Sequence, residues 1–196
     1  NLAIPAEVAP NTVHVLPMMA RPFFPVQTAP VILPKAPWFD TMQAVASAAH
    51  HLVALVMVRD GADGELTSEG FHTVGTVARV HHAATDDATL QFVAEGQQRV
   101  RIVRWLSAEA PFLAQVEYLD NVPDDGQEVK AYAMAVMATI KELINHNPLF
   151  GEEVKQFLNR FSPTNPSLIA QFAATITTAD ADKLQVCTVN TGADDG

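Results

Sequence analysis

The chain has 196 residues, of which 48% are apolar and 17% are charged, so it can bury a core and is not expected to be disordered. Its 22 acidic residues against 12 basic ones give a formal net charge of −10. This charge argues against nucleic acid and anionic membranes as partners, because both require basic patches. The single cysteine, Cys187, excludes an internal disulfide and is compatible with a reducing, cytoplasmic setting, and no apolar run is long enough to predict a transmembrane helix.

The first part of the chain predicts short extended segments around one helix. Residues 1–12 are expected to form an extended arm. The prolines between residues 17 and 37 lack N–H donors, so apolar pieces there can only be edge strands or irregular segments. Asp40 is expected to cap an amphipathic helix. The predicted elements are a strand at Val13–Leu16, an edge strand at Val31–Leu33, a helix at Thr41–His50 and a buried strand at Leu52–Val58.

The middle of the chain is its most strand-like part, because β-branched residues dominate it. Glu95–Arg99, which contains Gly96, is interpreted as the connection of a hairpin. The predicted strands are Val74–Val80, Thr89–Ala94, Val100–Trp105 and Leu113–Leu119.

The pattern changes at Asn121–Gly126, which is interpreted as a linker with a domain boundary near residue 122. Apolar residues then recur at helical spacing, which predicts the start of a helical bundle at residues 127–185. Residues 186–196 form an atypical tail, β-branched and poor in helix formers, interpreted as artificial in origin or as a truncated end. Strands followed by helices predict an α+β fold in two units, residues 13–121 and 127–185.

No pattern of a known catalytic site is found. The nine glycines form no phosphate-binding loop, no dinucleotide fingerprint and no nucleophile elbow. The adjacent histidines, His50–His51 and His81–His82, are expected to point to opposite faces and so not to share a metal ion. Cys187 has no nearby histidine to activate it. We therefore assign no catalytic residue, no metal site and no cofactor to the chain.

Arg99, Arg101 and Arg104 form the basic cluster of the sequence. They are expected to be the solvated face of a strand, paired with Glu117 on a neighbouring strand. The alternative is contact with nucleic acid or an acidic partner, which the net charge disfavours.

The proline-rich segment is the candidate binding region. Trp38 and Phe39 stand just before the expected helix, where packing on the helix is favoured over an exposed patch that grips peptides. The same two alternatives hold for the aromatic pair at positions 23 and 24, with core packing as the commoner role. The candidate substrate-binding residues are Phe23, Phe24, Lys35, Trp38 and Phe39.

Several stretches together resemble the N-terminal domain of ATP-dependent Lon proteases, over about residues 13–119. They are Val15-Leu16-Pro17 with Phe23-Phe24-Pro25, Pro30-Val31-Ile32-Leu33, Val74-Gly75-Thr76-Val77-Ala78, Ala94-Glu95-Gly96-Gln97-Gln98-Arg99 and Pro111-Phe112-Leu113-Ala114-Gln115-Val116-Glu117. The segments Ser167-Leu168-Ile169-Ala170 and Asp182-Lys183-Leu184-Gln185 look like the family's helical continuation. Where family members often carry Gly-Arg before the first helix, this chain has Pro34–Phe39, so substrate contacts are not carried over to it.

The resemblance implies a PUA-like β pseudo-barrel with a short helix. It also implies a non-catalytic region that recognises unfolded, damaged or tagged proteins and supports a homohexameric AAA+ protease in protein quality control. The ATPase domain, with its ATP and magnesium, and the Ser-Lys protease domain would lie downstream in the parent protein.

Three other interpretations stay open. The chain could be a standalone PUA-like module that binds another protein, although the helices after residue 127 favour a piece of the full protease. It could bind RNA, which a salt-dependent affinity would reveal. It could be a small hydrolase, which a deep pocket with perturbed titratable groups would indicate.

Overall fold

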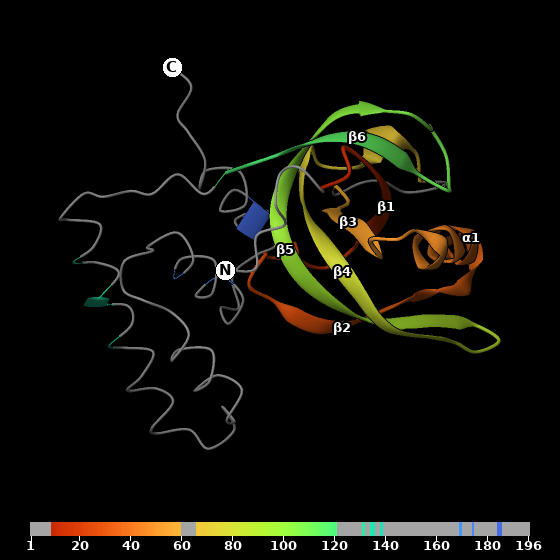
Figure 1. Ribbon diagram of the computed structural model, residues 1–196, viewed down its shortest axis with the longest axis horizontal. Coiled ribbons are helices and arrows are strands. Elements are labelled where there is room, and N and C mark those ends of the chain that lie inside the picture. The colour runs from red at the N-terminus through yellow and green to blue at the C-terminus, as the bar shows by residue number, and fades with distance from the viewer. Residues whose placement is uncertain are drawn as a thin grey trace.

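The computed structural model describes residues 9–59 and 66–120, together with eight residues further along the chain (Figure 1). All eight are helical: Ala131, Met134, Ala135, Ala138, Ile169, Ala174, Leu184 and Gln185. The linker expected at Asn121–Gly126, Cys187 and the tail at 186–196 lie outside the described residues, as does most of residues 1–12. The helical bundle as a whole therefore stays a prediction.

Six strands, one helix and one 3-10 turn lie within the described residues up to 120. They are β1 (Thr12–Met18), β2 (Thr28–Pro34), α1 (Lys35–Ser47), β3 (Leu52–Met57), η1 (Ser68–Gly70), β4 (Val74–Thr85), β5 (Thr89–Trp105) and β6 (Leu113–Tyr118). The predicted strands within β1, β2, β3, β4 and β6 are confirmed. Mostly sheet with one short helix is the architecture that the sequence pattern predicts for residues 13–121.

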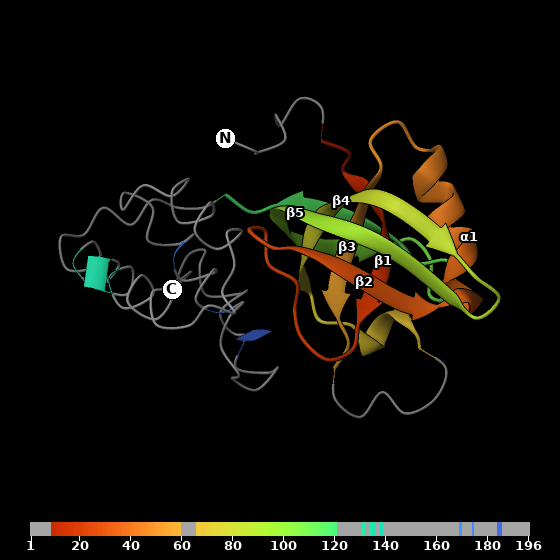
Figure 2. The same ribbon diagram turned by 90° about the horizontal axis from the view of Figure 1, so that it is seen from below.

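The strands form one sheet in the order β2-β5-β4-β3-β1-β6. Only β1 and β3 run parallel, and the other neighbours are antiparallel. The last strand, β6, also pairs with the second half of β5, while β2 pairs with its first half. The sheet is strongly bent and is not a clear barrel, in contrast to the expected pseudo-barrel. Figures 1 and 2 place α1 and the β4–β5 turn at the same end of this sheet.

Apolar side chains from all six strands and from α1 form the core. Every residue of β3 is buried, which agrees with its unbroken apolar sequence. At one end, Phe112 packs against Trp38, Phe71 and Trp105, with ring centroids 5.0–5.9 Å apart. This aromatic cluster fixes the start of α1 against the loops before β4 and β6.

The helix begins earlier than the sequence pattern predicts. It spans Lys35–Ser47, with a kink at Ala36, and Asp40 lies inside it as an exposed residue instead of capping it. Ala36 has a non-helical φ of −92° and ψ of 136°, so the uninterrupted helix starts at Pro37, where proline is tolerated because the first N–H groups of a helix have no intrahelical partner. As a result, Trp38 lies on the buried face with Thr41, Met42 and Val45.

The expected hairpin around Gly96 is wrong, because β5 runs without interruption from Thr89 to Trp105. Glycine is needed there for close packing: a Cβ at this position would lie 2.8 Å from Pro25 Cα and would also meet the carbonyl oxygen of Phe24. The pairing of β4 with β5 shifts by one residue beside Gly96, so the glycine marks a bulge and a close approach of backbone. The hairpin turn lies instead between β4 and β5, after Thr85.

Candidate functional site

Three residues at the junction of β2 and α1, here called the β2–α1 corner, combine an apolar and a cationic surface: Ile32, Lys35 and Phe39. Ile32 lies on the outer side of β2 and is 62% exposed, whereas Val31 and Leu33 are buried. Lys35 Nζ lies 5.4 Å from the centroid of the Phe39 ring, and both side chains are partly exposed. A cation above an aromatic face is a favourable arrangement that also keeps the ammonium accessible.

The β4–β5 turn holds the lysine in place. Lys35 N–H donates to the carbonyl of Ala88 at 2.8 Å, and Lys35 Nζ donates to the carbonyl of Asp86 at 3.1 Å. The Asp86 carboxylate accepts hydrogen bonds from the backbone N–H groups of Ala88 and Thr89 and from the Thr89 hydroxyl. The backbone bond from Thr89, then the one from Ala88, hold the pKa of the Asp86 carboxyl below its ordinary value. The β4–β5 turn therefore holds Lys35 of the β2–α1 corner in a fixed position.

The backbone of β2 is a poor template for another strand. Gln27 accepts from Gly96 and Lys35 donates to Ala88, so the odd-numbered residues of this strand turn their peptide groups towards β5. Pro30 and Pro34, at even positions, therefore face the edge that has no partner strand within the described residues. Prolines lack the N–H that an added strand would need. The corner consequently offers side chains, not a backbone edge, to a ligand.

Three of the five predicted binding residues lie in the interior. Phe23 and Phe24 are 2% and 1% exposed, and Trp38 packs on Phe112 with ring centroids 5.9 Å apart. The packing alternative thus describes these three side chains, while Lys35 and Phe39 are the two candidates that the structure brings together at the surface. Whether any of the five contacts a substrate stays a prediction.

Ile32 was not predicted to belong to this surface. The sequence does carry a signal for it, because Ile32 lies between Pro30 and Pro34 and alternates with the two buried residues of the strand. Large apolar side chains that are mostly exposed are candidates for contact with a partner.

The basic cluster divides between the interior and the surface. Arg99, expected on the solvated face, is 1% exposed, and its burial lowers the pKa of its guanidinium. Arg101 Nη1 lies 3.4 Å from Glu117 Oε2, which confirms the expected cross-strand pair for that residue. Arg104 is exposed. Arg99 and its neighbour Val100 are both buried, so both faces of β5 are covered at this point of the strand.

A seam joins the sheet to the helical residues that follow it. Phe24 forms a buried cluster with Ala174 and Leu184, and Val26 packs against it. Arg21 Nη2 donates to the carbonyl of Ala174 at 3.0 Å. Gln185 Nε2 donates to the carbonyl of Val74 at 3.0 Å. Phe24 therefore helps to hold the two parts of the chain together.

Within the described ranges, no group of three or more histidine, cysteine, aspartate or glutamate side chains could hold a metal ion. Nor is any described helix long and apolar enough to cross a membrane.

Comparison with known families decides what this fold is. The sequence model of the ATP-dependent protease La (LON) substrate-binding domain matches residues 12–186. The chain belongs to this family. The match covers the sheet and the helical residues at the seam, so the Lon domain includes both.

Curated relatives are Lon proteases of bacteria. "Lon protease 2" of Hydrogenovibrio crunogenus is 38% identical over 177 residues, which are 90% of this chain and 20% of the relative. The Lon protease of Protochlamydia amoebophila is 35% identical over 180 residues, or 90% of this chain and 21% of the relative. The chain thus spans about a fifth of the length of these relatives.

Solved structures share the fold. The N-terminal domain of the Mycobacterium avium complex Lon protease superposes with a TM-score of 0.68 at 18% identity, covering 92% of this chain and 91% of that one. A Lon N-terminal domain protein from Xanthomonas campestris gives a TM-score of 0.61 at 12% identity, covering 90% of this chain and 89% of that one. The chain therefore has the fold of a Lon N-terminal domain.

Proposed function

We propose that the chain is the substrate-recognition region of an ATP-dependent Lon-type serine protease, binding unfolded, damaged or tagged proteins for degradation elsewhere in the parent protein. The match of the substrate-binding family over residues 12–186 carries this proposal. Catalysis, ATP and magnesium would belong to the four-fifths of the relatives that the chain does not cover. Assembly of a homohexamer and action in the cytoplasm are part of the same proposal.

The β2–α1 corner is the surface we assign to substrate. An unfolded segment exposes apolar and acidic side chains together, and the corner presents Phe39 beside the ammonium group of Lys35, with the exposed Ile32 three residues before this lysine on β2. The return of β6 to β5 also supports the PUA-like pseudo-barrel interpretation, in which loops at one end of a bent sheet carry the contacts. RNA binding has less support, because Arg99 is buried and Arg101 lies beside Glu117.

The test compares binding of the purified chain to a chemically unfolded protein and to the same protein folded. We expect preference for the unfolded form. Ile32→Ser and Phe39→Ala should each weaken it by roughly threefold to tenfold, since each removes about 1 kcal/mol of apolar contact. Fluorescence anisotropy with a labelled unfolded protein measures the change.

Val103→Ser is the matched control, because Val103 is 59% exposed on β5 and so resembles Ile32 in exposure and shape. If the Val103 and Ile32 variants lose the same affinity for unfolded protein, any exposed apolar side chain contributes equally. The β2–α1 corner would then not be the binding surface. No preference for the unfolded form would contradict recognition by this chain on its own.

A further inference from the structure

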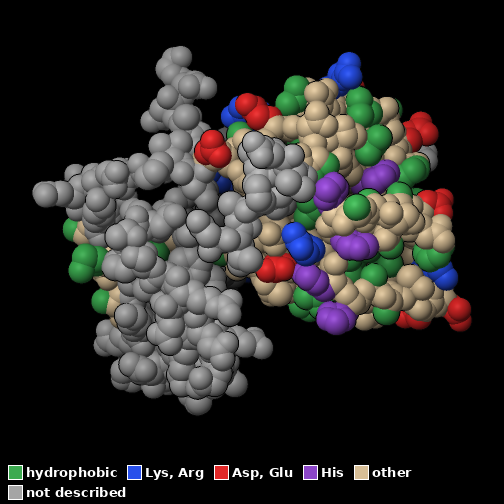
Figure 3. All heavy atoms as spheres, viewed as in Figure 1, with side chains coloured by type: hydrophobic (Ala, Val, Ile, Leu, Met, Phe, Trp, Pro, Cys, Tyr) green, Lys and Arg blue, Asp and Glu red, His purple; other side chains and the backbone are tan. Residues whose placement is uncertain are grey.

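Histidine side chains gather on one face of the molecule, over the sheet beside α1 (Figure 3). Two adjacent pairs contribute to it, His50–His51 after α1 and His81–His82 in β4. The carbonyl of His51 accepts a hydrogen bond from Val80 N–H at 2.9 Å, which brings the first pair next to the second. We call these four residues, with Arg79 on the same strand, the histidine face.

A bulge builds this face. Adjacent residues of a regular strand point to opposite sides, yet the His81 and His82 ring centroids are only 6.5 Å apart. The pairing of β4 with β5 shifts between His81 and Ala84, and His82 has a φ of 50°, so the bulge turns its side chain towards that of His81. The expectation that the two rings point to opposite faces is thus wrong.

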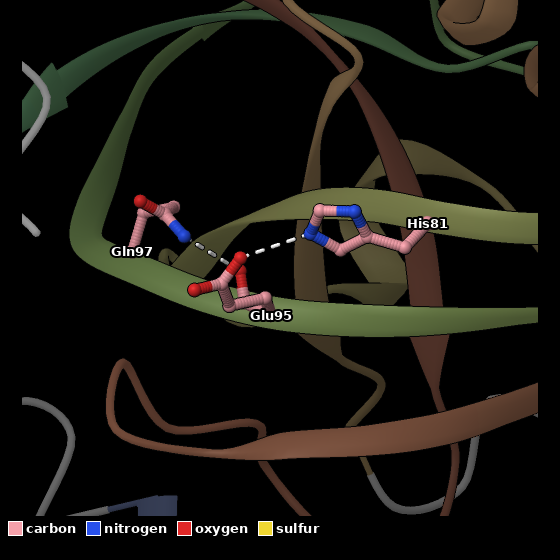
Figure 4. A network of polar contacts seen from close by, with 3 residues as sticks. All are labelled: His81, Glu95 and Gln97. Atoms are coloured by element: carbon pink, nitrogen blue, oxygen red, sulfur yellow. Dashed lines mark hydrogen bonds and ion pairs between the residues drawn. The ribbon is translucent and has the colours of Figure 1, made fainter.

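The charge of the face depends on protonation of its histidines. His81 Nε2 lies 2.9 Å from Glu95 Oε2, and the side chain of Gln97 donates to the Glu95 backbone carbonyl (Figure 4). Glu95, from β5, is paired with His81, and Asp86 and Asp87 lie in the turn that follows β4. Arg79 on β4 is exposed, and the carboxylate of α1, Asp40, lies in the middle of that helix. A protonated imidazole is a cation, so protonation of these histidines adds positive charge to this face of a protein with a net charge of −10.

An open strand edge adjoins the same residues. The pairing of β3 with β4 ends at Leu52 and Arg79, and the His51–Val80 bond follows it. Beyond Val80, β4 pairs with β5 on one side and has no other partner strand within the described residues. Residues 82–85 of β4 are exposed. An extended segment can add its backbone to such an edge and place alternate side chains over the neighbouring surface.

We propose that the histidine face and the adjoining edge of β4 bind an extended polypeptide segment rich in aspartate and glutamate, in mild acid. This names a substrate class and rests on the proposed function for its biological meaning. A flexible acidic segment fits better than a second copy of this chain, since a symmetric pair of copies would place one histidine face against another of the same charge.

The test measures anisotropy of a labelled glutamate-rich peptide at about pH 6 and pH 7.5, with a lysine-rich peptide and an RNA oligonucleotide as comparisons. We expect the acidic peptide to bind about tenfold tighter at the lower pH, and the gain to disappear at about 0.5 M salt because screening shortens the range of the charges. The triple change His50→Asn, His51→Asn and His82→Asn should abolish the gain. Asparagine is chosen because His51 and His82 have positive φ, which asparagine accepts.

A second variant keeps the test decisive if the first folds poorly. His50→Lys with His81→Lys should bind the acidic peptide already at pH 7.5. The matched control, Glu109→Gln with Asp120→Asn, changes the net charge by the same amount at exposed positions outside the face and should not. Equal binding by this control, equal binding of RNA, self-association in place of peptide binding, or no pH effect would each overturn the proposal. Binding of unfolded protein at neutral pH tests the proposed function separately.

Discussion

Two buried threonines, Thr76 and Thr41, differ in their hydrogen bonds and should therefore differ in their contribution to the stability of the fold. Thr76 Oγ1 donates to the carbonyl of Phe23 at 2.6 Å, and this bond anchors the segment before β2 against β4. Thr41 Oγ1, on α1, is equally buried but has no hydrogen-bond partner among the described residues.

Thr76→Val should therefore lower the free energy of unfolding by about 1–3 kcal/mol, because it leaves the Phe23 carbonyl buried without its donor. Thr41→Val is the matched control, because it removes a buried hydroxyl that makes no hydrogen bond among the described residues. The free energy of unfolding should therefore stay the same or rise. Urea unfolding of both variants measures the difference. Equal losses would mean that the Phe23 bond contributes nothing specific.

The residue scale also shows what the sequence could not reveal. Arg99 was expected on a solvated face of its strand, but both Arg99 and Val100 are buried, because distant parts of the chain cover the face that local alternation assigns to solvent. The direction of the His82 ring depends on a bulge that only the pairing of β4 with β5 defines. Ile32, in contrast, follows from simple alternation within its own strand.

The β4–β5 turn is the element whose stability should depend on pH. The backbone N–H groups of Thr89 and Ala88 stabilise the charged form of Asp86, so the pKa of this exposed carboxyl is lower in the folded chain than in the unfolded one. Its contribution is therefore fully present above the unfolded pKa, near about 3.9, and is lost as pH falls through the folded value.

Asp86→Asn should remove this part of the pH dependence and loosen the turn that holds Lys35. Asp87→Asn, at the neighbouring exposed position, is the control and should leave it unchanged. Carboxyl chemical shifts followed by NMR through acid titration report the pKa directly. An Asp86 carboxyl that titrates at the ordinary value would contradict the hydrogen-bond arrangement described above.

Helices and strands could be predicted where the local sequence pattern determines their structure. They could not be predicted where contacts with distant backbone determine it. The β-branched runs and the alternation of β1, β3 and β6 gave correct strands. Gly96 was interpreted as a turn, because glycine has that role locally, whereas its actual role depends on Phe24 and Pro25, which are far away in the sequence. Distant residues also bury two of the aromatic candidates: Phe24 packs with Ala174 and Leu184, and Trp38 packs on Phe112.

At the scale of the whole molecule, the seam makes the helical residues part of the stability of the sheet. Leu184 is 2% exposed in the cluster with Phe24, and Gln185 donates to the β4 backbone. The two units expected from the sequence pattern are therefore in contact, and unfolding of one unit should destabilise the other.

Leu184→Ala should destabilise the sheet by about 2–4 kcal/mol through loss of burial and the cavity left beside Phe24. Both tryptophans of the chain, Trp38 and Trp105, lie in the sheet part, so their fluorescence reports unfolding there, while circular dichroism reports the helices. We expect the two signals to change together and to shift together in the variant. Met134→Ala, at a helical position that is 60% exposed, is the control and should shift the midpoint by less than about 0.5 kcal/mol. A tryptophan transition that ignores Leu184→Ala would mean that the sheet folds independently and that the seam only positions the helices.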